Sequence, residues 1–161
     1  MPLVRDALDA LTERIIGCGI AVHRCLGPGL LESIYRDCLL LELRYEAIPV
    51  DLERRVPIIY RGERIATPLK IDLLVDQQVV VEVKAIDAFH PVHQAQVITY
   101  FKLTGLPAGL LINFNTTALR QGIRRVSHPD LHAARRRVAA EPPACSKESS
   151  SPEVWMPPDL L

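Results

Sequence analysis

The stretch that most constrains the fold is the run VVVEVKA at residues 79–85, in the middle of the chain. Its β-branched residues are typical of a strand, and a short apolar run that follows the turn-like residues 76–78 predicts a buried one. Because side chains alternate between the faces of a strand, Glu82 and Lys84 share one face, and Val81, Val83 and Ala85 occupy the other. A buried strand with two charges on one face needs partners for both of them.

The preceding strand supplies Asp72, and the loop between the strands decides whether this residue joins the two charges. If residues 76–78 form a three-residue loop, Val75 pairs with Val79 and Asp72 lies opposite Glu82. A one-residue slip would move every side chain to the other face, so the apolar pattern favours this register. It gathers six apolar residues on one side: Ile71, Leu73, Val75, Val79, Val81 and Val83.

Two carboxylates on opposed residues lie close together, because the β-carbons there are only about 4.5–5.5 Å apart. Lys84 supplies one positive charge, and a divalent cation, Mg²⁺ or Mn²⁺, completed by water and substrate phosphate, would supply more. Alternatively, Asp72 and Glu82 are solvated residues on an open sheet face. Leu74 and Val80 lie on the same face as the charges, which indicates partial burial and favours a paired or metal-bound site.

The rest of the chain predicts an α/β domain. Helical spacing of apolar residues predicts helices at 4–26, 30–46 and 90–104. Short β-rich or continuous apolar runs predict strands at 50–60, 64–75 and 79–85, before the third helix, and at 108–114 and 121–127, after it. The first three strands are predicted to form a meander. Residues 1–127 are therefore expected to form one domain, and the proline- and serine-rich residues 128–161 are expected to be a disordered tail.

Composition limits the partners and the location. The chain has 19 basic and 19 acidic residues, so no global positive field favours a polyanionic partner, and any nucleic-acid contact must be local. The N-terminal residues 1–17 contain charges among their apolar positions and lack the uninterrupted run of a signal peptide or membrane span. We expect a cytoplasmic protein with no membrane contact.

These residues resemble a known family. Asp72, separated by nine residues from Glu82-Val83-Lys84, resembles the signature of the PD-(D/E)XK nuclease superfamily. The order helix, three-stranded meander, helix, strand is similar to the restriction-endonuclease-like core of that superfamily, with an extra N-terminal helix. GLLESIY at residues 29–35 is similar to the motif of the GxxExxY family within it, and the likeness, which includes QAQVITYFK and TGLPAGLLINF, extends from about Ile15 to Val126.

The resemblance implies roles for the residues at the centre of the motif. Asp72 and Glu82 would be metal ligands, and the backbone carbonyl of Val83 would be a further one. Lys84 would orient the attacking water or stabilise the negative charge of the transition state. Glu32 would reach the metal directly or through water, although the helix dipole alone explains a carboxylate at the start of a helix.

Two residues of the third helix would line the same site. Gln96 and Tyr100 are four residues apart on one helical face, and the resemblance implies that they contact DNA or the catalytic lysine. Amphipathic packing is the alternative for this pair. His93 lies one turn before Gln96 and could face the same cleft, but we expect it to be a surface histidine.

The leading hypothesis is a Mg²⁺- or Mn²⁺-dependent nuclease that hydrolyses phosphodiester bonds of DNA. The alternative is a catalytically inactive module that binds nucleic acid or protein on the same fold. Five arginines are available for phosphate contacts, or are solvated surface: Arg54, Arg55, Arg120, Arg124 and Arg125. A homodimer would allow both strands of a duplex to be cut.

Overall fold

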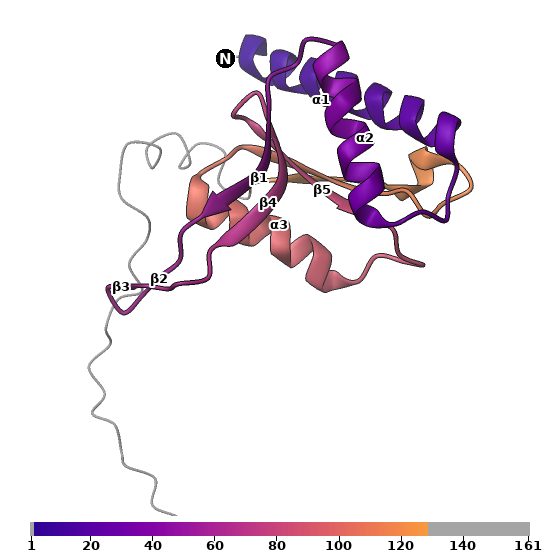
Figure 1. The fold of residues 1–161 in the computed structure, drawn as a ribbon. Coiled ribbons are helices and arrows are strands. Elements are labelled where there is room, and N and C mark those ends of the chain that lie inside the picture. The colour runs from indigo at the N-terminus through magenta and orange to yellow at the C-terminus, as the bar shows by residue number, and fades with distance from the viewer. Residues whose placement is uncertain (1, 129–161) are drawn as a thin grey trace, which may run out of the picture.

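The computed structural model describes residues 2–128, which form a mixed five-stranded sheet with helices on both faces (Figure 1). Helices α1 (Pro2–Leu26) and α2 (Glu32–Tyr45) pack on one face, and α3 (Pro91–Thr104) packs on the other. No helix in this part of the chain combines the length and the apolar character that crossing a bilayer requires. The predicted α/β class is confirmed, and residues 129–161, the expected tail, lie outside the described residues.

The sheet has the strand order β1-β4-β5-β6-β7, with β1 at Val50–Val56, β4 at Leu69–Val75, β5 at Val79–Lys84, β6 at Ala108–Asn113 and β7 at Ile123–Ser127. Strands β1, β4 and β5 form the predicted antiparallel meander. After the crossover through α3, β6 pairs with β5 in parallel, and β7 closes the sheet antiparallel to β6. The last strand begins later than expected, because the 3₁₀ turn η1 (Leu119–Gly122) occupies its predicted start.

Two of the predicted strands are each interrupted near a proline, which has no N–H to donate to a ladder. Pro57 separates β1 from β2 (Ile59–Tyr60), and Pro68 lies between β3 (Glu63–Arg64) and β4. Strands β2 and β3 pair only with each other, through a turn in which Arg61 and Gly62 have φ values of 52° and 84°. Residues 57–68, here called the arm, form a hairpin that projects beyond the main sheet (Figure 1).

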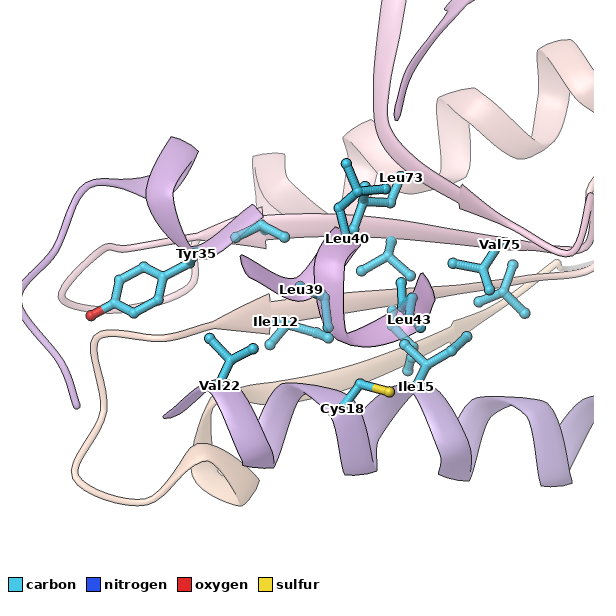
Figure 2. Close-up of a cluster of buried hydrophobic side chains, with 14 of the residues drawn as sticks. Ile15, Cys18, Val22, Tyr35, Leu39, Leu40, Leu43, Leu73, Val75 and Ile112 are labelled. Carbon is cyan, nitrogen blue, oxygen red and sulfur yellow. The ribbon is translucent and has the colours of Figure 1, made fainter. Parts of the chain in front are cut away.

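The face under α1 and α2 is a continuous apolar core. Ile15, Cys18 and Val22 point from α1 toward α2 and the sheet (Figure 2). Their spacing of three and four residues places them on one stripe of the helix, and α2 presents Leu39 and Leu43 to the same cluster. This side of the sheet is therefore packed with apolar side chains.

The face under α3 contains a smaller core. Val97, Tyr100 and Phe101 of α3 pack against apolar residues of β4, β5 and β6. Gly109 of β6 lies directly beneath them, because a β-carbon built at this position would be 2.6 Å from Cγ1 of Val97. The helix lies this close to the strand only because residue 109 has no side chain.

The register between β4 and β5 is the predicted one, with Val75 paired to Val79 and Leu73 to Val81. The expectation that Ile71 shares a face with Leu73 is wrong, because Ile71 packs in the α3 core. Opposite this part of β4, Glu53 has a φ of 48°, and the β1–β4 ladder skips the position where Glu53 and Asp72 would meet. This local break shifts the alternation of side chains between Leu73 and Ile71.

Candidate active site

Strands β4 and β5 separate at Asp72. Their ladder ends at the pair Leu73–Val81, one step before Asp72 and Glu82 would be opposed. Beyond that point, the backbone N–H of Val83 donates a hydrogen bond to Oδ2 of Asp72 over 2.9 Å. A side-chain carboxylate thus takes the place of a strand carbonyl, and it is held at the edge of the opening between the strands.

Glu82 and Lys84 meet on the face that the sequence predicts. Lys84 Nζ donates a hydrogen bond to Glu82 Oε1 over 2.8 Å, and Glu82 is only 3% exposed. The other oxygen, Oε2, is buried and has no hydrogen-bond partner among residues 2–128. Buried polar atoms are normally satisfied, so this unpaired carboxylate oxygen indicates a position for a ligand.

The electrostatics of the two carboxyl groups follow from burial and from their proximity. Burial, followed by the charge of Asp72, raises the pKa of Glu82 to about 7, although Lys84 opposes the shift. Burial also raises the pKa of Asp72, against the hydrogen bond from Val83 and the charge of Lys84. Both carboxylates are therefore held in a place that favours added positive charge.

Lys84 stays protonated in this environment. Burial alone would lower the pKa of its ammonium group, but the hydrogen bond to Glu82 and the charges of Glu82, Glu32 and Asp72 together outweigh burial and raise it. The ammonium is thus a fixed positive charge beside the two acids. It can stabilise a negative charge that develops next to it.

The site fits a divalent cation in part. Two carboxylates, one with an unpaired buried oxygen, are the hard oxygen ligands that Mg²⁺ and Mn²⁺ prefer. No group of three or more His, Cys, Asp or Glu side chains within the described residues is arranged to hold a metal ion. A cation bound by Asp72 and Glu82 would therefore need further ligands, such as the Val83 carbonyl, water or a substrate phosphate.

Glu32 is the first residue of α2 and approaches Asp72 and Glu82 from that helix. The negative charge of Glu32 contributes to the raised pKa values of both Glu82 and Lys84, so its carboxylate lies near the site. No hydrogen bond of its carboxylate to another residue is present in the described part of the chain. This position is compatible with both roles considered for Glu32, a helix-dipole contribution and a metal ligand.

Tyr35 fixes the turn that leads to Glu32. Its hydroxyl donates to the carbonyl of Gly27 over 2.5 Å and accepts from the N–H of Leu30 over 3.1 Å. Its ring is fully buried and stacks on Phe114 at 4.6 Å. Tyr35 therefore braces the loop between α1 and α2 and does not itself reach the carboxylates.

Gln96 and Tyr100 connect α3 to the strand that carries Asp72. Gln96 Nε2 donates to the hydroxyl of Tyr100 over 2.9 Å, and this hydroxyl donates to the carbonyl of Lys70 over 2.7 Å. Burial and the charge of Glu82 raise the pKa of Tyr100 to about 12. The structure thus brings the pair beside the acids and also gives Tyr100 a clear packing role.

Two further polar residues lie near the site, and the sequence singles out only His93 of the two. His93, expected at the surface, is partly buried, and the nearby charge of Lys84 adds to burial in lowering its pKa. Asn113 is buried and exchanges two hydrogen bonds with the backbone of Ile86, which fixes the segment after Lys84. An asparagine inside the apolar run of β6 is the sequence signal that could have identified it.

The arginine clusters do not gather at the site. Arg125 forms an ion pair with Asp9, and Arg124 donates to backbone carbonyls and lies over the ring of Phe89. Arg120 is exposed near the start of β7. Arg54 and Arg55 are exposed on β1, directly before the arm.

A mixed sheet whose central strands open around an Asp–Glu–Lys cluster defines an α/β protein with an acidic, lysine-containing site. Comparison with protein-family models matches residues 9–126 to the PD-(D/E)XK nuclease superfamily, and the chain belongs to this superfamily. The expected restriction-endonuclease-like fold class is thereby confirmed. No curated protein and no solved structure matches the chain. The likeness to the GxxExxY family remains a prediction.

Proposed function

We propose that this protein is a metal-dependent nuclease that hydrolyses phosphodiester bonds of DNA at the cluster of Asp72, Glu82 and Lys84. One observation carries the proposal: a buried Glu82 oxygen that has no hydrogen-bond partner among residues 2–128 lies next to a second carboxylate and a lysine. Membership of a nuclease superfamily implies a nucleic-acid substrate and, in general, a divalent metal ion. The proposal adds DNA as the substrate and Mg²⁺ or Mn²⁺ as the ion.

Asp72 and Glu82 would hold the cation, with the Val83 carbonyl and Glu32 as further ligands. A bound divalent cation would neutralise part of the phosphate charge and make a nearby water more acidic. Lys84 has its own part, because its ammonium can orient that water or stabilise the charge that grows on the phosphate oxygens. Water would add to phosphorus and lose a proton to the solvent, the P–O bond to the leaving oxygen would break, and the leaving oxygen would take up a proton from the solvent.

Gln96 and Tyr100 would position the substrate or Lys84 from α3. Their hydrogen bonds to each other and to Lys70 restrict the rotamers that both side chains can adopt. In this proposal, Tyr100 keeps α3 against β4, and Gln96 presents its carboxamide to the substrate. A homodimer in the cytoplasm, able to cut both strands of a duplex, completes the proposal.

The decisive experiment measures cleavage of labelled single- and double-stranded DNA by the purified protein with Mn²⁺ or Mg²⁺. Asp72→Asn and Lys84→Ala should each lower the rate by about a hundredfold or more, since each removes charge from the reacting centre. Asp37→Asn and Lys102→Ala, two exposed residues outside the site, are the matched controls and should keep wild-type rates. Unchanged cleavage in both site variants would reject this centre.

The second candidate is a binding module without catalysis. It is favoured by the lack of a third ligating side chain close to Asp72 and Glu82 within residues 2–128. Titration calorimetry with Mn²⁺ separates the two functions. A nuclease should take up Mn²⁺ in a way that Asp72→Asn abolishes, whereas a binding module should take up none and still bind DNA.

A further inference from the structure

Within the described residues 2–128, the arm, residues 57–68, stands apart from both apolar cores. Every residue from Tyr60 to Thr67 is exposed. A two-stranded hairpin on its own is only marginally stable in water, and this one adds almost nothing to the buried core. Its position outside the sheet therefore calls for a function other than packing.

Positive charge is concentrated in the arm and in its root, the flanking residues 53–56 and 69–70, although the chain is neutral overall. Between residues 53 and 70 there are five basic residues and two acidic ones, against 19 of each in the whole chain. The basic residues are Arg54, Arg55, Arg61, Arg64 and Lys70. Arg55, Arg61 and Arg64 form no ion pair with any residue in 2–128, so their charges are available to a partner.

The tip of the arm adds an aromatic surface. Tyr60 is 54% exposed, and the guanidinium of Arg61 lies 5.7 Å from the centre of its ring. The surface is also hollowed at the root, where Arg54, Arg55 and Thr104 contribute to a pocket. Unpaired cations together with an exposed aromatic ring are the features with which proteins hold a nucleic-acid strand, through phosphate contacts and base stacking.

The arm leads directly into the strand of the candidate active site. Leu69 is the first residue of β4, and Asp72 is the fourth. Because β4 and β5 are antiparallel, the start of β4, which follows the arm and carries Asp72, corresponds to the end of β5 that carries Lys84. A nucleic-acid strand held at the base of the arm would thus lie at the start of the β-strand that carries Asp72.

From this placement we infer that the arm is a nucleic-acid-binding surface, in which Arg61 and Arg64 contact phosphates and Tyr60 stacks on an unpaired base. The inference rests on the proposed function for its choice of ligand, because an anionic strand is the substrate of the neighbouring site. The arm contributes to the affinity for the nucleic-acid strand and takes no part in the hydrolysis itself. Tyr60 gives the surface a preference for strands with unpaired bases, since stacking needs an accessible base face.

The test measures binding of the full chain to a fluorescent oligodeoxynucleotide by anisotropy, in EDTA and over a range of salt concentrations. Arg61→Ala/Arg64→Ala should bind the single strand at least about fivefold more weakly, and the salt slope should fall by roughly one for each arginine removed. Arg61→Lys/Arg64→Lys keeps the charge and should keep the slope. Arg44→Ala, an exposed arginine at the end of α2, is the control and should change neither quantity.

Tyr60→Ala provides an independent measurement. It should weaken binding of a single strand by about fivefold or more while changing duplex binding much less. Equal losses on both ligands would overturn the stacking role. Wild-type affinity and slope in the double arginine variant, or no binding by the wild type in EDTA, would overturn the inference as a whole.

The outcome is separable from that of the proposed function. If the arm variants bind normally while Asp72→Asn abolishes cleavage, the arm inference fails and the nuclease stands. If binding depends on the arm but neither Mn²⁺ nor Mg²⁺ supports cleavage, the nuclease fails and the arm stands.

Discussion

The two halves of strand β5 have opposite environments although they are continuous. Val79, Val80 and Val81 pair with β4 on one side and β6 on the other, and all three are fully buried. From Glu82 onward β6 continues the ladder but β4 departs, and Asp72 supplies the acceptor for the N–H of Val83. Within six residues, the strand therefore passes from a region that stabilises the fold to a region that contains buried charges. The difference indicates that stability and chemistry can be changed separately here.

Substitutions in the core around the first half of β5, residues 79–81, should have the largest effect on stability. Leu73→Ala removes a fully buried side chain from the core under α1 and α2, and we expect a loss of about 3 to 5 kcal/mol in the free energy of unfolding. Urea denaturation measures it. Asp72→Asn, the next residue along β4, is the paired variant and should cost far less. If the two variants lose equal stability, the separation of the two halves is wrong.

The second half of β5, which begins at Glu82, should make the stability of the fold depend on pH. Folding raises the pKa of Glu82 to about 7 from its ordinary 4.5, so the folded protein binds this proton more tightly than the unfolded chain does. The resulting stability is fully present below about pH 4.5 and is lost as pH rises toward and past 7. We expect the metal-free protein to lose about 2 to 3 kcal/mol between pH 4.5 and pH 8.

Glu82→Gln tests this prediction, because glutamine resembles the protonated acid and does not titrate. Its unfolding free energy should be nearly constant over the same pH range, apart from the smaller contribution of Asp72. A Glu42→Gln variant on α2 serves as the control and should retain the wild-type slope. A wild-type protein that becomes more stable from pH 4.5 to pH 8 would contradict the burial argument for Glu82.

Divalent metal should offset part of that loss of stability at high pH. Mn²⁺ at about ten times its dissociation constant should stabilise the folded protein by about 1.4 kcal/mol, and the gain should shrink below pH 7 as Glu82 takes up its proton. Thermal unfolding with Mn²⁺ and with EDTA measures the difference. The gain should vanish in Asp72→Asn and persist in Leu73→Ala, which keeps the ligands. A gain that survives in Asp72→Asn would place the metal elsewhere.

The smallest expected effect compares the two buried tyrosines. Tyr100→Phe removes the hydroxyl that links Gln96 to the carbonyl of Lys70, and should cost about 1 kcal/mol in stability. Tyr35→Phe removes a hydroxyl with two backbone partners and should cost about the same amount. Cleavage assays then distinguish them, since only Tyr100 lies next to the acids. A larger loss of activity in Tyr35→Phe would show that the loop before Glu32 matters more than α3.

The sequence predicts most of this fold because two periodicities are strong in it. The valine-rich alternation of β5 fixes the register with β4, and the helical spacing in α1 fixes the stripe that contains Ile15 and Cys18. The break at Glu53 could not be predicted, because a positive φ at a glutamate depends on tertiary contacts and not on local preference. For the same reason the expected face of Ile71 is wrong.

The candidate site is predictable only up to the residues that share a strand or a helix face. Glu82 with Lys84, and Gln96 with Tyr100, are brought together by local geometry alone. The hydrogen bond from Val83 to Asp72 depends on where β4 leaves β5, and the two hydrogen bonds between Asn113 and Ile86 depend on where the segment after β5 lies against β6. Such features arise between elements, and no single stretch of sequence encodes them.

Gly109 has an effect that reaches beyond its own strand. It lies on β6, outside the charged cluster, yet the closeness of α3 to the sheet depends on the bare hydrogen at this position. A single added methyl group would push against Val97 and Phe101 and tilt the helix outward, carrying Gln96 and Tyr100 with it. The depth at which α3 presents its polar side chains is thus controlled by a residue that offers no functional group.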